Sequence, residues 1–215
     1  SVAFHVDDLL VSCVDQEPID EMVRLLLAEF AGVSEVRGAK HSYLAMNLEL
    51  GTEFYTLDMG GYLKKILAGR EARGAKTPAT SDLCKDPVDS PLLDAAEQKA
   101  FHSDVATILF IAKRVKMECL TSVSMLASRV NVATEADRDK LNRVFGYLAH
   151  TEDVRMRFRC GGNVELTAYV DASWATHDDG HGRTGIVLMM AECAVAAWSS
   201  KQKMVTRSST ESEIV

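Results

Sequence analysis

The first residues of the chain alternate between apolar and polar side chains around a pair of acids. Apolar residues occupy every second position over residues 2–6, Asp7 and Asp8 follow, and an apolar run covers residues 9–11. Strand-forming residues on both sides of a short polar step are typical of two strands joined by a tight turn. The pattern therefore predicts a β-hairpin with Asp7 and Asp8 at its tip.

Helical and strand-like periodicities alternate in the rest of the first third of the chain. Pro18 suits the first turn of a helix, and Gly32 and Gly69 are typical helix stops. The spacing of apolar residues predicts the following elements in chain order: a helix over 18–30, strands over 43–50 and 53–57 joined across 51–52, and a helix over 62–67.

Residues 70–93 differ in composition, because Gly, Pro, Ser, Thr and Asp dominate, and they predict a linker. Three helical patterns follow, and the third begins with a capping box over residues 134–137. From residue 154 the apolar period falls to two, which predicts strands with a turn at Gly161 and Gly162. The expected elements are helices over 94–116, 119–132 and 134–149, strands over 154–158, 164–170, 186–190 and 194–198, and a helix that begins over 208–213.

Composition supports a globular protein, and the helical and strand patterns along the chain predict a mixed α/β (α+β-like) fold. The 215 residues are 47% hydrophobic, and a net charge of −7 argues against strong autonomous binding of nucleic acid. Charge is uneven, since residues 1–30 hold seven acids and one base, whereas residues 111–159 hold ten bases and six acids. That distribution fits metal-assisted work on a polyanion, and it fits ordinary surface variation equally well.

Five scattered cysteines without a C-x-x-C spacing are typical of reduced thiols in an intracellular protein. No apolar stretch is long enough to span a bilayer, so we expect no membrane partner. No signal peptide is visible, and the chain starts inside a strand pattern, so we expect it to be a piece of a larger protein.

Two groups of carboxylates are candidates for metal chemistry. Asp7 and Asp8 offer hard oxygen ligands that suit Mg²⁺ or Mn²⁺, although an Asp pair is also common in solvated turns. Asp171 ends an apolar strand, and Glu213 lies on the helix that begins near residue 208. A strand Asp that meets a helix Glu is one way to hold a two-metal site. The alternative is that Glu211 and Glu213 only offset the dipole of the helix.

Other reactive-looking residues have simpler structural explanations. The His- and Gly-rich segment 177–182 lies between two strands, which favours a solvated hairpin loop over a metal cluster. We expect cysteines and tryptophans to be buried and basic residues near the C-terminus to be solvated, namely Cys160, Cys193, Trp174, Trp198, Lys201, Lys203 and Arg207.

Taken together, several short motifs resemble the Ty1/copia-type retrotransposon polyprotein, from the end of its reverse transcriptase through the connection into ribonuclease H. Each motif is weak alone, but their shared order over the whole chain is specific. Residues 5–10 resemble the Tyr-Val-Asp-Asp hairpin of the family. The other matching segments, in order, are 43–48, 62–66, 77–78, 144–148, 169–175, 197–201 and 208–213.

The resemblance implies roles for four carboxylates. Asp7 and Asp8 match the polymerase aspartates, Asp171 matches the first ribonuclease H carboxylate, and Glu213 is the best match to the second. The family uses further carboxylates that this chain does not hold. His5 replaces the usual Tyr and Ala45 the usual Gly, and neither change removes a metal ligand.

The resemblance also implies an organisation and a set of partners. Residues 1–70 would be part of the reverse-transcriptase palm, 71–93 a linker, 94–152 a helical thumb or connection, and 153–215 a truncated ribonuclease H-like antiparallel sheet. The parent protein would use Mg²⁺ or Mn²⁺, an RNA template, a DNA primer, deoxynucleoside triphosphates and RNA–DNA hybrids. It would work beside the rest of its polyprotein in a cytoplasmic virus-like particle, with a possible nuclear stage.

Two other functions remain open on the sequence. The chain could be a decayed or domesticated module that binds nucleic acid or protein without catalysis, which its acidic net charge and incomplete sites would fit. It could also be a stand-alone metal-dependent nuclease, although that would require a complete carboxylate set.

Overall fold

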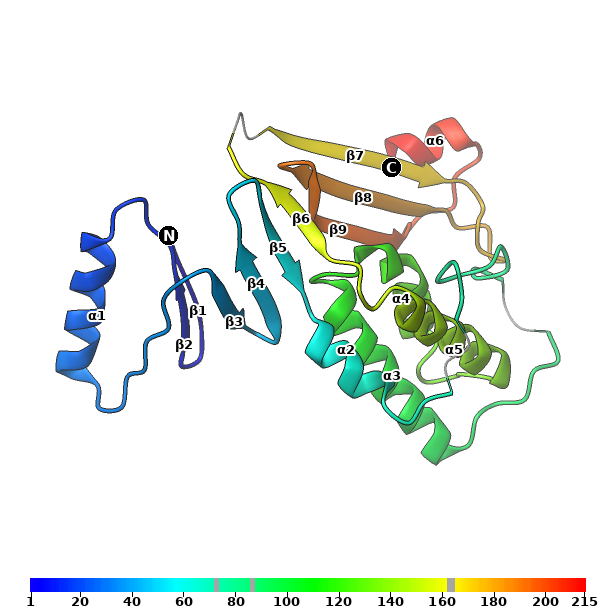
Figure 1. Ribbon diagram of the computed structural model, residues 1–215. Helices are drawn as coiled ribbons and strands as arrows, with labels where there is room; N and C mark the ends of the chain where they lie inside the picture. Colours follow the sequence, from blue (N-terminus) through cyan, green and yellow to red (C-terminus); the bar gives the residue numbers. More distant parts are fainter. Residues whose placement is uncertain (72–73, 86–87, 162–164) are drawn as a thin grey trace.

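The protein combines helices with antiparallel sheets, as the sequence predicts (Figure 1). The structure is a computed structural model that describes residues 1–71, 74–85, 88–161 and 165–215. The helices are α1 (Glu17–Glu29), α2 (Gly60–Leu67), α3 (Ala95–Ala112), the 3₁₀ helix η1 (Met117–Cys119), α4 (Leu120–Ala127), α5 (Glu135–His150) and α6 (Ser209–Ile214). The strands are β1 (Val2–His5), β2 (Asp8–Val11), β3 (Lys40–Tyr43), β4 (Met46–Leu50), β5 (Phe54–Asp58), β6 (Met156–Arg159), β7 (Leu166–Ser173), β8 (Arg183–Met190) and β9 (Cys193–Lys201).

The strands form three antiparallel sheets. β1 and β2 form a hairpin, the second sheet has the order β3-β4-β5-β6, and the third has the order β7-β8-β9. The β4–β5 hairpin lies where the sequence predicts it, with Leu48 opposite Leu57. β6, which follows the helices along the chain, pairs with β5 and so returns to the second sheet.

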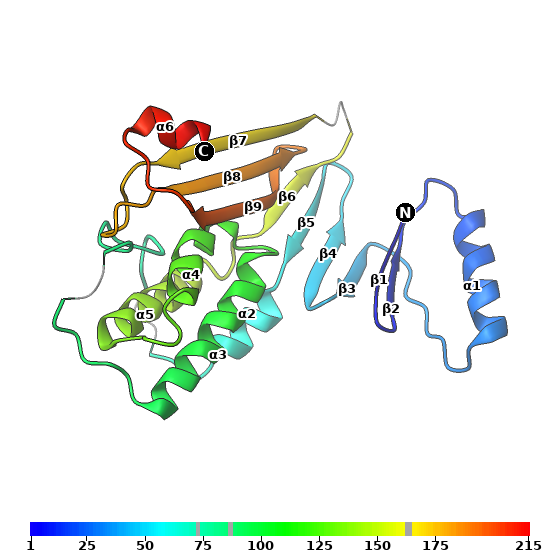
Figure 2. The same cartoon turned by 180° about the vertical axis from the view of Figure 1, so that it is seen from behind.

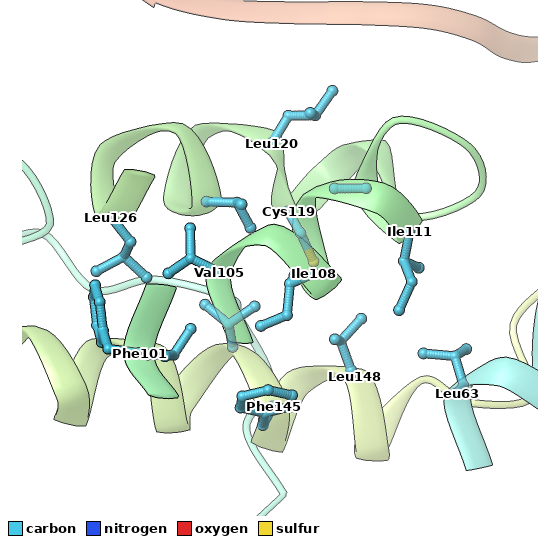
Figure 3. Close-up of a cluster of buried hydrophobic side chains, with 14 of the residues drawn as sticks. Leu63, Phe101, Val105, Ile108, Ile111, Cys119, Leu120, Leu126, Phe145 and Leu148 are labelled. Carbon is cyan, nitrogen blue, oxygen red and sulfur yellow. The ribbon is translucent and has the colours of Figure 1, made fainter. Parts of the chain in front are cut away.

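The main core lies between the helices from α2 to α5. α5 carries apolar residues at helical spacing, and Leu141, Val144, Phe145 and Leu148 are all buried as predicted. Figure 3 shows Ile108 of α3 close to Leu148 of α5, and neither residue has any exposed surface. Each such side chain contributes about 1.5–3 kcal/mol on burial, so this cluster is the main apolar contribution to stability.

The capping box predicted for α5 is present. The Thr134 side chain accepts a hydrogen bond from the backbone N–H of Asp137, and the Asp137 carboxylate accepts one from the backbone N–H of Thr134. α3 begins with the same motif, formed by Asp94 and Glu97. Both helices therefore start where side chains satisfy their free N–H groups.

The N-terminal segment lies apart from this core. β1, β2 and α1 have no buried residue, and Figures 1 and 2 both show them displaced from the helices and the other sheets. α1 nevertheless follows the predicted pattern, with a proline at its start and Gly32 beyond its end. An isolated two-stranded hairpin is only marginally stable in water and usually needs further strands or a helix packed against it. The N-terminal segment has no buried residue that would provide this support.

The predicted single strand over 43–50 is wrong, because the chain turns at Leu44 and Ala45. Both residues have left-handed backbone, with φ of 51° and 62°, and β3 and β4 form a hairpin around them. Two consecutive left-handed residues are usually Gly, Asn or Asp, so the Leu-Ala pair carries no turn signal. The apolar run over 43–50 therefore looked continuous.

Several predicted ends also shift. The helix over 94–116 ends at Ala112, and the helix over 119–132 shortens to α4, with η1 between them. The predicted strand over 164–170 begins at Leu166 among the described residues, and its residue 164, like Gly162 of the predicted turn, lies outside the described residues. In the linker segment, the described residues form no helix or strand beyond one bridge between Leu92 and Thr134.

Candidate functional site

The hairpin of β1 and β2 places Asp7 and Asp8 at its tip, as predicted. His5 pairs with Asp8, so Val6 and Asp7 form a two-residue turn between the strands. Val6 has a φ of 56°, which is a strained conformation for a β-branched residue. Asp7 and Asp8 are both exposed, so this turn presents two carboxylates side by side to the solvent.

The second pair of carboxylates comes from β7 and α6. Asp171 lies near the end of β7, opposite Gly185 of β8. Glu213 lies on α6, and its Oε1 accepts a hydrogen bond from the backbone N–H of Ala172 at 3.3 Å. The neighbour of Asp171 along β7 therefore holds the Glu213 carboxylate, although Ala172 and Glu213 are far apart in the sequence.

The start of α6 separates the roles of its two glutamates. Ser208 caps the helix by accepting a hydrogen bond from the N–H of Glu211, and Glu211 Oε2 accepts one from the N–H of Arg207 at 2.7 Å. Glu211 therefore serves the helix start, as the alternative interpretation expected. Glu213 contacts β7 instead, so the dipole explanation does not account for its position.

Each pair offers two hard oxygen ligands of the kind that Mg²⁺ and Mn²⁺ prefer. Among the described residues, no group of three or more His, Cys, Asp or Glu side chains could hold a metal ion. The donor sets therefore fit a divalent cation in type but hold fewer ligands than a two-metal site needs. Figures 1 and 2 place the N-terminal hairpin and α6 at opposite ends of the molecule, so the two pairs cannot share one site.

The His- and Gly-rich segment 177–182 is a loop between β7 and β8, as predicted. Asp179 is paired with Lys201 and with His181, whose Nδ1 lies 3.0 Å from Asp179 Oδ1. The hydrogen bond from Lys201 holds the pKa of Asp179 well below its usual range. Burial, together with nearby Lys201, lowers the pKa of His177. These contacts tie the loop to Lys201 at the end of β9.

Burial makes two of the cysteines unreactive. Burial raises the pKa of the Cys119 thiol to about 12, and it also raises the pKa of Cys193. Cys160 and Cys193 are half-buried, where full burial was expected. Because the thiolate is the reactive form, Cys119 and Cys193 are poor nucleophiles at neutral pH.

The prediction that Trp174 and Trp198 are buried is wrong, because they are 50% and 52% exposed. Trp198 lies in β9, beside Ile186 of β8, on a sheet face with exposed apolar residues. Trp174 is fixed by its Nε1, which donates a hydrogen bond to the carbonyl of Thr206 at 2.9 Å. Whether a large apolar residue is buried depends on what covers its sheet, which the alternating pattern does not reveal.

Sequence reasoning also missed several buried polar side chains. Lys116, Gln202, Thr206 and Ser212 are all at most 7% exposed. Three of them lie in or near α6, and no local spacing marks them, because Gln202 binds β8 and α6 while Thr206 and Ser212 bind each other.

Comparison with known proteins adds the family context. A transposon Ty5-1 protein of Saccharomyces cerevisiae is 27% identical over 223 residues, which cover 100% of this chain and 70% of that protein. The retrovirus-related Pol polyproteins from transposons RE2 and RE1 of Arabidopsis thaliana are 27% and 26% identical over 97% of this chain. The chain is a homologue of copia-type retrotransposon Pol polyproteins. The predicted resemblance is therefore confirmed at this level.

The homology covers a small part of the polyproteins, since the chain spans 14% of the length of each Arabidopsis relative. No family model matches the chain, and no solved structure matches it. Among the described residues, no helix is long and apolar enough to cross a membrane.

Proposed function

We propose that this Pol homologue is part of an RNA-directed DNA polymerase with ribonuclease H activity. Asp7 and Asp8 would belong to the polymerase site, and Asp171 and Glu213 to the site that cleaves RNA–DNA hybrids. The observation that best supports the proposal is the contact of Glu213 with the N–H of Ala172, because it brings a helix carboxylate to the strand that carries Asp171. The exposed Asp pair on a distant hairpin supports a second, separate site.

The chemistry of each site would depend on Mg²⁺ or Mn²⁺, which stabilises charge on the attacking and leaving oxygens of phosphoryl transfer. Asp7 and Asp8 would hold the cation where primer, template and a deoxynucleoside triphosphate meet. Asp171 and Glu213 would hold it at the scissile phosphate of the hybrid. The N–H of Ala172 keeps one oxygen of Glu213 in place, so this carboxylate needs little reorganisation on binding.

Each pair supplies only two carboxylates, so other parts of the polyprotein would complete the sites. The N-terminal segment supports such a contact, because Phe4 on β1 is 76% exposed and Phe30 after α1 is 62% exposed. Exposed aromatic residues of this kind are typical of protein interfaces. We therefore propose that another part of the polyprotein, in a cytoplasmic particle, packs on this segment.

The decisive experiment uses the parent polyprotein with single substitutions. Asp7→Asn is expected to abolish primer extension and to spare hybrid cleavage, and Asp171→Asn is expected to do the reverse. Asp15→Asn and Glu165→Gln, which alter exposed acids in the same parts of the chain but outside the two pairs, are matched controls that should change neither activity. Loss of both activities from either site substitution, with folding intact, would refute two separable sites.

The second candidate function is a non-catalytic module that binds protein or nucleic acid. The exposed apolar residues of the N-terminal segment would fit a protein-binding role as well. If Asp7→Asn and Asp171→Asn leave the activities of the polyprotein unchanged, this candidate is favoured instead.

A further inference from the structure

A group of buried polar side chains lies where α6 meets the end of β9. Gln202, Thr206 and Ser212 are 7%, 5% and 1% exposed, although most of their neighbours are exposed. A polar group pays a desolvation cost on burial unless it finds hydrogen-bond partners. Three such groups in one place therefore indicate a network that fixes a specific geometry.

The side-chain amide of Gln202 is the centre of this network. Its Nε2 donates to Thr184 Oγ1 of β8 at 3.1 Å and to the carbonyl of Ser212 in α6 at 2.8 Å. Its backbone N–H donates to the carbonyl of Gly182 at 2.9 Å. One residue thus links the central strand of the third sheet to the last helix.

Gly182 makes room for this amide. A Cβ atom at Gly182 would lie 2.3 Å from Gln202 Oε1 and 2.4 Å from the carbonyl oxygen of Ser173. Both distances are far shorter than real contacts, so a side chain at this position would displace the amide or the strand. The close approach of Gln202 to the loop depends on a glycine here.

Two more bonds fix α6 and the segment that leads into it. The hydroxyl groups of Thr206 and Ser212 are hydrogen-bonded, and the carbonyl of Thr206 accepts the bond from Trp174 Nε1. α6 has only six residues, and a helix of that length is not stable by itself. Its position must therefore come from these contacts.

We propose that Gln202 is a positioning residue for Glu213. The carbonyl that Gln202 holds belongs to Ser212, the residue directly before Glu213, and Glu213 reaches the N–H of Ala172 beside Asp171. This inference rests on the proposed function for its meaning in catalysis, because Asp171 and Glu213 would hold the cation. The geometric part, that Gln202 keeps Glu213 on β7, can be tested without a metal.

The test uses the full chain and NMR spectroscopy of the Ala172 amide. Gln202→Met keeps a similar volume and removes both donors. Glu213→Ala serves as the reference for a lost contact. Gln98→Met is the matched control. Gln98 lies in α3, and its Nε2 also donates to a backbone carbonyl, that of Leu93. We expect Gln202→Met to move the Ala172 amide resonance to its position in Glu213→Ala, and Gln98→Met to leave it unchanged.

Binding of Mn²⁺ supplies the second readout. Loss of a partner that orients a ligand typically weakens metal binding by 10–100-fold, so Gln202→Met should raise the Kd for Mn²⁺ about tenfold. An unchanged Ala172 resonance in Gln202→Met would overturn the inference, whatever the metal result. Absence of Mn²⁺ binding near Asp171 in the unmodified chain would count against the proposed function instead.

A measurement on the unmodified chain covers the case in which Gln202→Met does not fold. The two Nε2 protons of Gln202 should exchange slowly with solvent and show nuclear Overhauser effects to Ser212. Fast exchange without such effects would overturn the inference without any variant.

Discussion

Replacing Asp137 with alanine should remove one of the largest polar contributions to the stability of this chain. The Asp137 side chain has no exposed surface. Its carboxylate accepts hydrogen bonds from the backbone N–H of Thr134 at 2.9 Å, from Thr134 Oγ1 at 3.0 Å and from Arg129 Nε at 2.8 Å. The substitution would therefore break a helix cap and an ion pair whose carboxylate is buried.

The size of the effect follows from burial. Removing one partner of a buried ion pair typically costs about 3–5 kcal/mol, and the lower end applies here because the Arg129 side chain is 20% exposed. Asp94 forms the same capping box at the start of α3, but it is exposed, and loss of an exposed cap costs about 1 kcal/mol. Asp137→Ala should therefore be about three times as damaging as Asp94→Ala.

The assay is urea unfolding at neutral pH, followed by the far-ultraviolet circular dichroism of the helices. Asp139→Ala is a matched control, since Asp139 lies on the exposed side of the same helix and such changes usually stay within about 0.5 kcal/mol. If Asp137→Ala and Asp94→Ala lower the free energy of unfolding equally, burial does not set the strength of these caps. A loss below about 1 kcal/mol for Asp137→Ala would refute the reasoning directly.

Two further predictions concern backbone strain and a buried amine. Ala45→Gly should raise the free energy of unfolding by about 0.5 kcal/mol, since glycine avoids the cost of left-handed backbone at a φ of 62° but loses more chain entropy; lower stability in the same urea assay would contradict this. Lys116 is buried, and its Nζ donates a hydrogen bond to the carbonyl of Thr151 at 2.6 Å; burial lowers its pKa. Between that lowered pKa and 10.5, the unfolded chain binds more protons at this residue than the folded chain. The free energy of unfolding should therefore rise as the pH rises through that window. Lys116→Met should lack this rise. If the difference in free energy of unfolding between the unmodified chain and Lys116→Met stays constant at alkaline pH, the prediction is wrong.

Helices of the middle segment could be predicted because their signals are local. The apolar residues of α5 repeat at helical spacing, and the Thr134–Asp137 box marks its start within four positions. The same patterns did not show that Asp137 would be buried and paired with Arg129, since that depends on how α4 and α5 pack. The local sequence therefore predicts that the cap is present, but it does not predict how much the cap contributes to stability.

Strand pairing was harder to predict than strand formation. A period of two shows which residues share a face, but it does not say which strand lies alongside. β6 has the expected alternation, with Phe158 buried and Arg157 and Arg159 exposed, yet its partner is β5, about a hundred residues earlier in the chain. The Leu44–Ala45 turn was missed for a related reason, because neither residue is typical of a turn.

The approach of Glu213 to β7, rather than that of Glu211, can be understood from helix geometry. Successive residues of an α-helix are about 100° apart around its axis, so Glu211 and Glu213 point about 200° apart. Glu211 turns back to the N–H of Arg207 as part of the helix start, which leaves Glu213 on the opposite side. Gln202 and Thr206 both bind Ser212 and so fix how α6 is turned about its axis. In this orientation the Glu213 side of the helix faces β7 and the N–H of Ala172. The capping pattern could thus have told the two glutamates apart from sequence, but only the buried network explains why the helix lies where Glu213 reaches the N–H of Ala172.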